Sequence, residues 1–240
     1  MKYNIKLSTV TTYKFGGYCN NFYKISNNDI DLFDEAFSNK EYFILGKGSN
    51  VAFSDKDYEG NVINPDFNEI SFIKNSGEVK VGSSVFLPDI ARFYKDKNLI
   101  NAEFLIGIPG SVGGAVKMNA GAYGWEFSDI LSSIEVYNLV TKKIETLDKD
   151  DINFSYRSSS NLENKVIISA TLIGTEGDPA LIRSRLKENI KYRKDTQPSA
   201  IYNAGSVFKN TDQYSAGELI DKAGLKGFSI DGVKVSTKHA

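Results

Sequence analysis

The chain has 240 residues, of which 41% are hydrophobic, so it can bury one substantial core or two smaller cores that share an interface. Its 29 basic and 30 acidic residues are scattered and give a formal charge of -1, which argues against nucleic acid or an anionic membrane as partner. One cysteine rules out an internal disulfide, and one histidine without Cys or His neighbours rules out a zinc site, so no metal is expected. Because the N-terminus lacks the apolar run of a signal peptide and no long apolar segment follows, we expect a cytoplasmic protein.

Apolar periodicity predicts short strands in alternation with helices, which is an α+β pattern. The expected helices cover residues 28–36, 88–94 and 178–193. The expected strands cover residues 42–45, 61–63, 69–73, 78–81, 133–139, 143–147 and 166–174. Residues 133–147 are predicted to form an antiparallel hairpin. In the last helix, Ile182, Leu186 and Ile190 recur at four-residue spacing and are expected on one side.

Two stretches are nearly bare of side chains. The first is GKGSN over residues 46–50, directly after an expected strand, and the second is GIPGSVGGAVKMNAGAYG over residues 107–124, with six glycines and three alanines. So little side chain predicts a flat ligand pressed against the backbone, although a run of tight turns is the alternative. A strand that ends in such a loop can present several backbone N–H groups to a phosphate or pyrophosphate.

The spacing of the glycines excludes two common nucleotide sites. Neither the GxGxxG of a Rossmann fold nor the GxxxxGK of a P-loop occurs at residue 46 or residue 107. Two bare loops about sixty residues apart indicate instead a long dinucleotide between two α+β lobes, and a flavin fits that shape.

A series of longer motifs then covers almost the whole chain. They are TTYKFGG (11–17), LGKGSN (45–50), GIPGSVGGA (107–115), MNAGAYG (118–124), FSYRSS (154–159), Arg193 with Gln197 and Pro198, AGSVFKN (204–210), AGELID (216–221) and VSTKHA (235–240). In content and order they resemble the UDP-N-acetylenolpyruvoylglucosamine reductases, the MurB family.

The resemblance implies a vanillyl-alcohol-oxidase-like (PCMH-type) FAD-binding fold in a monomer. It places two FAD-binding α+β lobes at residues 1–64 and 65–195, and an incomplete α+β substrate-binding lobe at residues 196–240. In the implied reaction NADPH reduces FAD, and hydride then passes to the enolpyruvyl ether of UDP-N-acetylglucosamine. The product is UDP-N-acetylmuramate, a precursor of peptidoglycan.

The resemblance also implies the residues of the FAD site, all in the two bare stretches. They are Gly46, Lys47, Gly48, Ser49, Asn50, Gly107, Ile108, Pro109, Gly110, Ser111, Gly113, Gly114, Ala115, Asn119 and Gly121. Lys47 stands where many members carry glycine.

The reduction needs a cation against the substrate carboxylate and an acid that delivers a proton. Arg157 suits the first role because its planar guanidinium binds a carboxylate through two hydrogen bonds, and the alternative is a surface arginine in a hairpin. By resemblance Ser206 is the proton donor, although taken alone it would be a turn residue. The remaining polar residues on matching motifs, expected to hold the nucleotide sugar, are Tyr156, Arg193, Gln197, Lys209 and Asn210.

One feature departs from the family pattern. Members continue well past the VSTKHA motif and carry a catalytic glutamate near the C-terminus, whereas Glu218 lies in a different motif. We therefore expect a fragment of a longer protein, with the catalytic glutamate missing from this chain. Two other functions remain as alternatives: a noncatalytic module that binds FAD or a UDP-sugar, and a flavin-dependent carbohydrate oxidase of the same fold.

Overall fold

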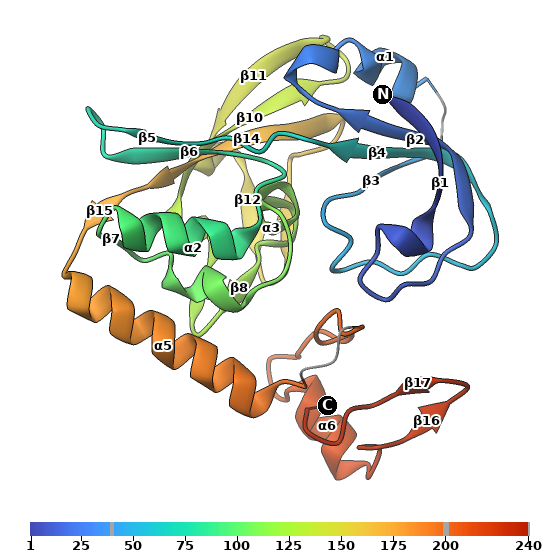
Figure 1. Cartoon of the computed structure of the whole chain (residues 1–240), viewed down its shortest axis with the longest axis vertical. Coiled ribbons are helices and arrows are strands. Elements are labelled where there is room, and N and C mark those ends of the chain that lie inside the picture. The colour runs from blue at the N-terminus through green and yellow to red at the C-terminus, as the bar shows by residue number, and fades with distance from the viewer. Residues whose placement is uncertain (39–40, 199–201, 240) are drawn as a thin grey trace.

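The computed structural model describes residues 1–38, 41–198 and 202–239. The N-terminal part is a four-stranded sheet in the order β1-β2-β4-β3. Its strands are β1 (Lys2–Lys6), β2 (Tyr18–Ile25), β3 (Tyr42–Ile44) and β4 (Tyr58–Pro65). Strands β2, β4 and β3 run parallel, so their carboxyl ends meet at one edge of the sheet (Figure 1). Two short helical segments, η2 (Asn27–Asp29) and α1 (Leu32–Ala36), follow β2, and η1 (Leu7–Thr9) follows β1.

A five-stranded antiparallel sheet forms the middle of the chain, in the order β11-β10-β14-β6-β5. Its strands are β5 (Ile70–Ile73), β6 (Glu78–Gly82), β10 (Leu131–Asn138), β11 (Lys143–Asp148) and β14 (Lys165–Ile173). The shorter elements around it are β7 (Leu99–Ile100), β8 (Gly121–Ala122), β9 (Trp125–Glu126), β12 (Asn153–Ser155), β13 (Ser158–Ser160), β15 (Thr175–Glu176), η3 (Glu103–Gly107), η4 (Lys149–Asp151) and α4 (Phe127–Ile130).

Helices cover one face of this sheet (Figure 1). They are α2 (Leu87–Asp96) and α3 (Val112–Met118), whereas α5 (Pro179–Thr196) packs on α2 and η3, farther from the sheet. In α2 the side chains of Leu87, Ile90 and Tyr94 recur at helical spacing and are almost fully buried against the sheet. Proline occupies the first turn of both α2 and α5, where its missing N–H has no intrahelical partner to lose.

The two sheets share a hydrophobic core at their junction. Phe33 and Ile63 from the first sheet region pack with Tyr137 and Ile168 of the second, and the rings of Phe33 and Tyr137 stack at 4.9 Å. The Tyr137 hydroxyl also donates a hydrogen bond to Asp34 in α1 (3.2 Å). Because the sheets are joined through a packed interior, the loops that each sheet carries keep a defined separation.

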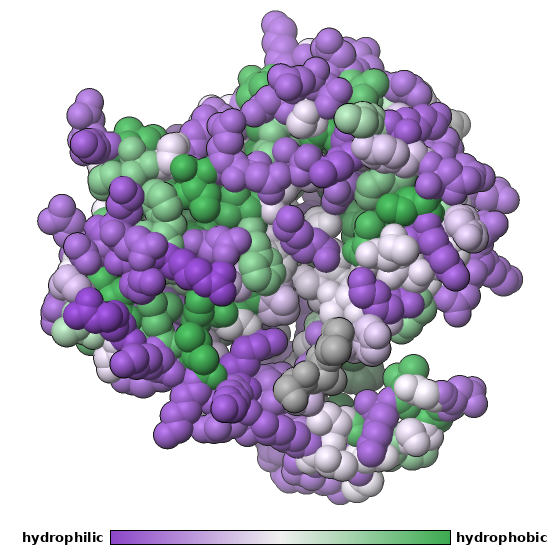
Figure 2. All heavy atoms as spheres, viewed as in Figure 1, coloured by the Kyte–Doolittle hydropathy of each residue, from purple (hydrophilic) through white to green (hydrophobic). Residues whose placement is uncertain are grey.

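Residues 202–239 form a small C-terminal lobe beyond the end of α5 (Figure 1). It holds α6 (Ala216–Lys222) and the hairpin of β16 (Ser229–Ile230) and β17 (Val233–Lys234). None of these described residues is buried, and Figure 2 shows apolar side chains at the surface of this lobe. Within the described part of the chain one hydrogen bond joins this lobe to the rest, from Lys238 Nζ to the carbonyl of Lys194 (2.5 Å). Ala240, the last residue of the VSTKHA motif, lies outside the described residues.

The predicted α+β class is confirmed, and so are the hairpin, the strands and the helices expected over residues 88–94 and 178–193, which the structure forms as Leu87–Asp96 and Pro179–Thr196. Three features differ from the sequence prediction. The helix expected over residues 28–36 is split into η2 and α1, and Ile190 is 52% exposed because the end of α5 runs beyond the core. The glycine-rich stretch contains the helix α3, which its composition concealed. No helix among the described residues is long and apolar enough to cross a membrane.

Candidate functional site

The first bare loop, residues 46–50, begins at the carboxyl edge of the parallel strands. Strand β3 pairs with β4 as far as Ile44 and Ile63, and the Leu45 amide continues the pairing by donating to the Ile63 carbonyl (2.8 Å). The Asn64 side chain, at the end of β4, donates to the carbonyls of Leu45 (2.7 Å) and Gly46 (3.1 Å). A polar side chain on the central strand thus fixes the direction in which the loop leaves the sheet.

Gly48 shows why this loop needs glycine. Its backbone is left-handed (φ 67°), and its carbonyl accepts a hydrogen bond from the Thr12 amide (2.9 Å). A Cβ at this position would collide with the Val10 carbonyl oxygen and lie 2.9 Å from the Cα of Thr11. The loop can therefore lie this close to residues 9–12 only with glycine at position 48.

The second bare stretch is held by the turn between β6 and α2. The Gly113 amide donates to the Ser83 carbonyl (2.8 Å), the Val112 amide to Val85 (3.1 Å), and the Leu87 amide to the Gly110 carbonyl (3.1 Å). These three bonds place residues 110–113, including the start of α3, against the five-stranded sheet.

The two bare loops touch each other. The Ser49 hydroxyl donates to the Pro109 carbonyl (3.1 Å), across sixty positions of sequence. A Cβ at Gly46 would meet the Ser111 hydroxyl, and a Cβ at Gly110 would lie 3.0 Å from the Ser49 hydroxyl oxygen. The absence of side chains at these glycines is what lets the loops approach.

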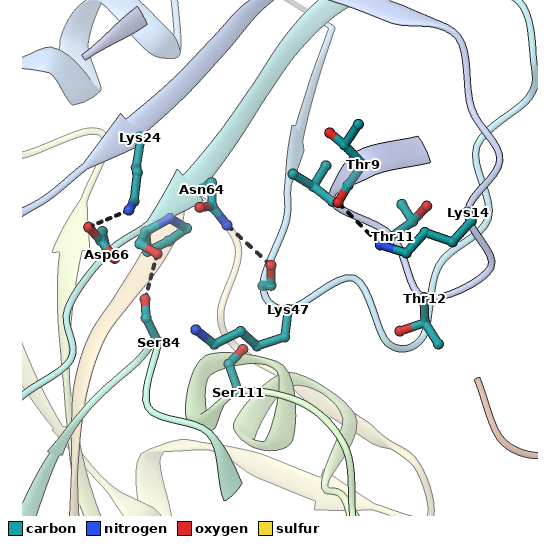
Figure 3. Close-up of a pocket in the computed structure, with 13 residues that line it drawn as sticks. Thr9, Thr11, Thr12, Lys14, Lys24, Lys47, Asn64, Asp66, Ser84 and Ser111 are labelled. Atoms are coloured by element: carbon teal, nitrogen blue, oxygen red, sulfur yellow. Dashed lines mark hydrogen bonds and ion pairs between the residues drawn. The ribbon is translucent and has the colours of Figure 1, made fainter. Parts of the chain in front are cut away.

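A cavity of about 430 Å³ opens beside this contact (Figure 3). It is lined by Thr9, Val10, Thr11, Thr12, Lys14, Lys24, Gly46, Lys47, Asn64, Pro65, Asp66, Ser84 and Ser111. Its wall carries hydroxyl groups, three lysines and a single carboxylate. The size lies within the usual range for ligand pockets, and the surplus of cations favours an anionic ligand.

Asp66 is the acidic group of this wall, and its neighbours stabilise the ionised carboxylate. Burial opposes its charge, but hydrogen bonds from Lys24 and Asn68 and the positive charges of Lys24 and Lys47 outweigh burial, so the pKa of Asp66 is lowered. Lys24 Nζ lies 2.9 Å from Asp66 Oδ2. Asp66 therefore neutralises Lys24 and leaves the other lysines uncompensated.

These features fit the phosphate-bearing part of FAD. The loops approach so closely that side chains at positions 46 and 48 would collide with their neighbours, and the cavity between them is polar and cationic. A diphosphate needs such a surface, with hydroxyl and backbone donors and compensating positive charge.

Arg157 lies in the turn between β12 and β13 with a left-handed backbone (φ 54°), so the hairpin expected as an alternative is present. Its guanidinium nevertheless packs on the second bare stretch. Nη2 donates to the Gly121 carbonyl (2.7 Å), Nη1 donates to the Asn119 carbonyl (3.3 Å), and Nη1 lies 3.5 Å from Glu126 Oε1. About a third of the side chain stays exposed, so the guanidinium can also meet a ligand.

The other predicted residues near this stretch have different surroundings. Tyr156 stacks its ring under the Arg157 guanidinium at 4.9 Å, and the Cδ of Arg193 would lie 3.4 Å from a Cβ at Gly107. The Asn119 side chain is buried and already engaged, since Nδ2 donates to Glu126 (2.6 Å) and Oδ1 accepts from the Ser128 amide (3.2 Å). Within the FAD set, the Ile108 amide donates to the Leu105 carbonyl, and Ala115 is buried in α3. Gly114 and Asn50 are exposed, and a Cβ at Gly114 would lie 3.6 Å from the Ser111 hydroxyl oxygen.

Ser206, Lys209 and Asn210 belong to the exposed C-terminal lobe. Asn210 Oδ1 accepts from the Ala216 amide (2.9 Å) ahead of α6, and Lys209 lines a small hollow of about 240 Å³ within the lobe. Gln197 ends α5, with its amide donating to the Arg193 carbonyl (2.8 Å). Among the described residues, no hydrogen bond or ion pair joins Ser206, Lys209 or Asn210 to Arg157 or to either bare loop.

Of the cavity wall, the predicted site residues include only Gly46, Lys47 and Ser111. Sequence reasoning missed the rest, namely Thr9, Val10, Thr11, Thr12, Lys14, Lys24, Asn64, Pro65, Asp66 and Ser84. Lys24 and Asn64 are register partners at the ends of the parallel strands β2 and β4. A polar residue at the end of each of two apolar strands could have indicated this part of the wall. That inference, however, requires knowing that β2 exists and that it lies beside β4.

The fold and the cavity define an FAD-binding flavoprotein. A protein-family model described as an FAD binding domain matches residues 35–147. The solved structure of a cholesterol oxidase from Brevibacterium sterolicum shares the fold over 73% of this chain and 37% of its own, with a TM-score of 0.52 at 12% identity.

Further comparisons define the protein family within the class of FAD-binding flavoproteins. A model of the UDP-N-acetylenolpyruvoylglucosamine reductase C-terminal domain matches residues 197–240. The UDP-N-acetylenolpyruvoylglucosamine reductase of Orientia tsutsugamushi (strain Ikeda) is 40% identical over 242 residues, which cover 98% of this chain and 80% of that protein. The crystal structure of the reductase from Thermus caldophilus matches with a TM-score of 0.88 at 30% identity, covering 100% of this chain and 86% of that one. The chain therefore belongs to the UDP-N-acetylenolpyruvoylglucosamine reductase family.

Proposed function

We propose that this protein uses NADPH and bound FAD to reduce UDP-N-acetylenolpyruvoylglucosamine to UDP-N-acetylmuramate, in the cytoplasm and as a monomer. Residues 1–64 and 65–195 act as the cofactor-binding lobes, and residues 196–240 as part of the substrate-binding lobe. The observation that supports this most is the contact between the two bare loops beside a cationic cavity, where Ser49 bonds to Pro109 (3.1 Å). Membership of the reductase family supplies the reaction.

FAD, which the two bare loops at residues 46–50 and 107–121 would hold, would supply the hydride transfer between NADPH and the outer carbon of the enolpyruvyl ether. Arg157 binds the substrate carboxylate and offsets the negative charge that develops next to it. Support comes from its position, because its guanidinium is held by the Gly121 and Asn119 carbonyls at the edge of the second bare loop and about a third of the side chain is still exposed. A planar guanidinium can serve both a backbone carbonyl and a carboxylate at once.

Ser206 delivers the proton to the neighbouring carbon, Lys209 pairs with the substrate diphosphate, and Asn210 positions that segment. Ser206 and Lys209 are exposed, and their side chains make no hydrogen bond or ion pair with the described residues. Their polar groups are therefore available to a substrate. The Asn210 side chain already ties its own segment to the start of α6, because Oδ1 accepts a hydrogen bond from the Ala216 amide (2.9 Å).

An anaerobic two-step assay tests the function. The purified holoprotein is reduced with NADPH, UDP-N-acetylenolpyruvoylglucosamine is added, and the visible absorbance of the flavin is followed. We expect the oxidised spectrum to return, whereas UDP-N-acetylglucosamine, which lacks the enolpyruvyl group, leaves the flavin reduced. Intact flavin binding without reoxidation by the enolpyruvyl substrate would contradict the reductase function and favour a binding module. Oxygen consumption with free sugars would instead favour the carbohydrate oxidase.

A further inference from the structure

The lysines of the cavity wall differ in whether they have partners. Lys24 pairs with Asp66 (2.9 Å), and Lys14 donates to the Thr9 carbonyl (3.3 Å). Lys47 makes no hydrogen bond or ion pair with any residue that the structure describes. Of the three lysines of the wall, Lys47 is therefore the one whose ammonium group has no hydrogen-bond or ion-pair partner among the described residues.

The backbone around Lys47 is fixed on both sides. The Gly46 carbonyl accepts from Asn64 (3.1 Å), and the Gly48 carbonyl accepts from the Thr12 amide (2.9 Å). In Figure 3 the Lys47 side chain extends across the cavity, with its nitrogen directed toward the side of the cavity that carries Ser84 and Ser111. The loop is thus built so that this one side chain reaches into the space that the bare backbone leaves free.

We infer that the Lys47 ammonium binds the diphosphate of FAD and supplies a charge-dependent part of the cofactor affinity. A lysine ammonium acts on phosphate as a point charge, and it needs no defined angle to do so. Lys24 suits this role less well, because its ammonium is already paired with the Asp66 carboxylate. This inference deepens the proposed function and rests on it only in taking FAD as the ligand.

The test compares FAD with riboflavin, which lacks both phosphates. Apoprotein of the wild type and of Lys47→Met is titrated with each flavin, and binding is followed by quenching of flavin fluorescence. Because the loss of one hydrogen bond between a charged group and the ligand is worth about 1.4 kcal/mol, or tenfold in Kd, we expect FAD to bind about tenfold more weakly. Riboflavin affinity should not change. In about 1 M salt, where the screening length falls to about 3 Å, the FAD difference should shrink.

Two further variants control for loss of charge and of shape. Lys56→Met removes the same charge from an exposed lysine of the first lobe that does not line the cavity, so FAD affinity should stay at the wild-type value. Lys47→Arg keeps the charge and should retain most of the FAD affinity.

Equal FAD affinity in Lys47→Met and wild type would overturn the role of Lys47 while leaving the reductase function standing. An equal loss for FAD and riboflavin would also overturn it, because the effect would then come from shape rather than from the phosphates. Failure of the wild type to bind FAD at all would overturn the proposed function, and this inference with it.

Discussion

Replacing Gly48 with alanine tests whether the first bare loop must lie against residues 9–12. The residue combines a left-handed backbone (φ 67°) with a close approach to Val10 and Thr11, so an added methyl group meets two separate penalties. The left-handed conformation costs an alanine about 1 kcal/mol. The steric overlap is with backbone atoms, which cannot rotate away, and overpacking of this kind costs about 2 kcal/mol.

Gly124 offers a matched control within the same body of the protein. Its backbone is also left-handed (φ 81°), but an added Cβ would have nothing within 4 Å. Gly124→Ala should therefore carry only the conformational cost of about 1 kcal/mol, against about 3 kcal/mol for Gly48→Ala. For a protein of this size these values correspond to falls in Tm of about 2–4 °C and about 6–12 °C.

Thermal unfolding of both variants, followed by circular dichroism, measures this difference, and FAD titration of the folded proteins shows whether the loop still binds. We expect weaker FAD binding in Gly48→Ala, because the displaced loop no longer presents its amides to the phosphates. Equal Tm values for the two variants would refute the close packing of residue 48 on residues 9–12.

Three other changes probe the site and its support. Arg157→Lys should slow flavin reoxidation by the enolpyruvyl substrate more than tenfold without changing FAD affinity, because a lysine cannot bind a carboxylate through two parallel hydrogen bonds while it also reaches the Gly121 carbonyl. Rapid-mixing absorbance measures the reoxidation, and a flavin-fluorescence titration measures the affinity. Asp178→Ala removes the acceptor of the Ala180 amide (2.9 Å) at the start of α5 and should lower Tm by about 2–4 °C, measured by thermal unfolding. Glu135→Gln should lower Tm at neutral pH by about 2 °C, with the difference from wild type closing in acid.

The sign of the Glu135 effect follows from its surroundings. Burial opposes its charge, but hydrogen bonds from Lys80 and Ser169, each 2.7 Å, outweigh burial and lower the pKa of Glu135. A lowered pKa stabilises the folded state above the unfolded pKa of about 4.3, and this contribution is lost as the pH falls through the folded value. A difference that persists undiminished at pH 3 would contradict this origin.

Two control variants carry the same substitutions, Asp to Ala and Glu to Gln, at exposed positions. They separate the loss of a specific contact from the general effect of removing a charge. Asp195→Ala, in the exposed last turn of α5, should leave Tm unchanged or slightly raised, because an acidic group there opposes the helix dipole. Glu59→Gln, at an exposed position, should show no pH-dependent difference from wild type. Unaltered reoxidation kinetics in Arg157→Lys would remove Arg157 from the reaction.

Local sequence patterns were sufficient where the structure is locally determined. The hairpin of β10 and β11, helix α2 and the Asp178 cap of α5 follow from periodicity and turn chemistry within short windows. The bare loops were recognisable because missing side chains are themselves a local property. Strand β1 escaped notice because it is an edge strand without a buried residue, and β2 because two asparagines interrupt its apolar positions.

The sequence by itself thus determined the α+β class, most strands of the two large sheets and the two loops that form one site, while the family motifs indicated the chemistry. Only the tertiary structure decided that β2 lies parallel to β4, that Lys24 faces Asp66, and that Ser49 reaches Pro109. These contacts join residues tens of positions apart. Nothing within a short window selects such partners, because they arise only when the sheets pack through a shared core and bring strand ends and loops to one edge.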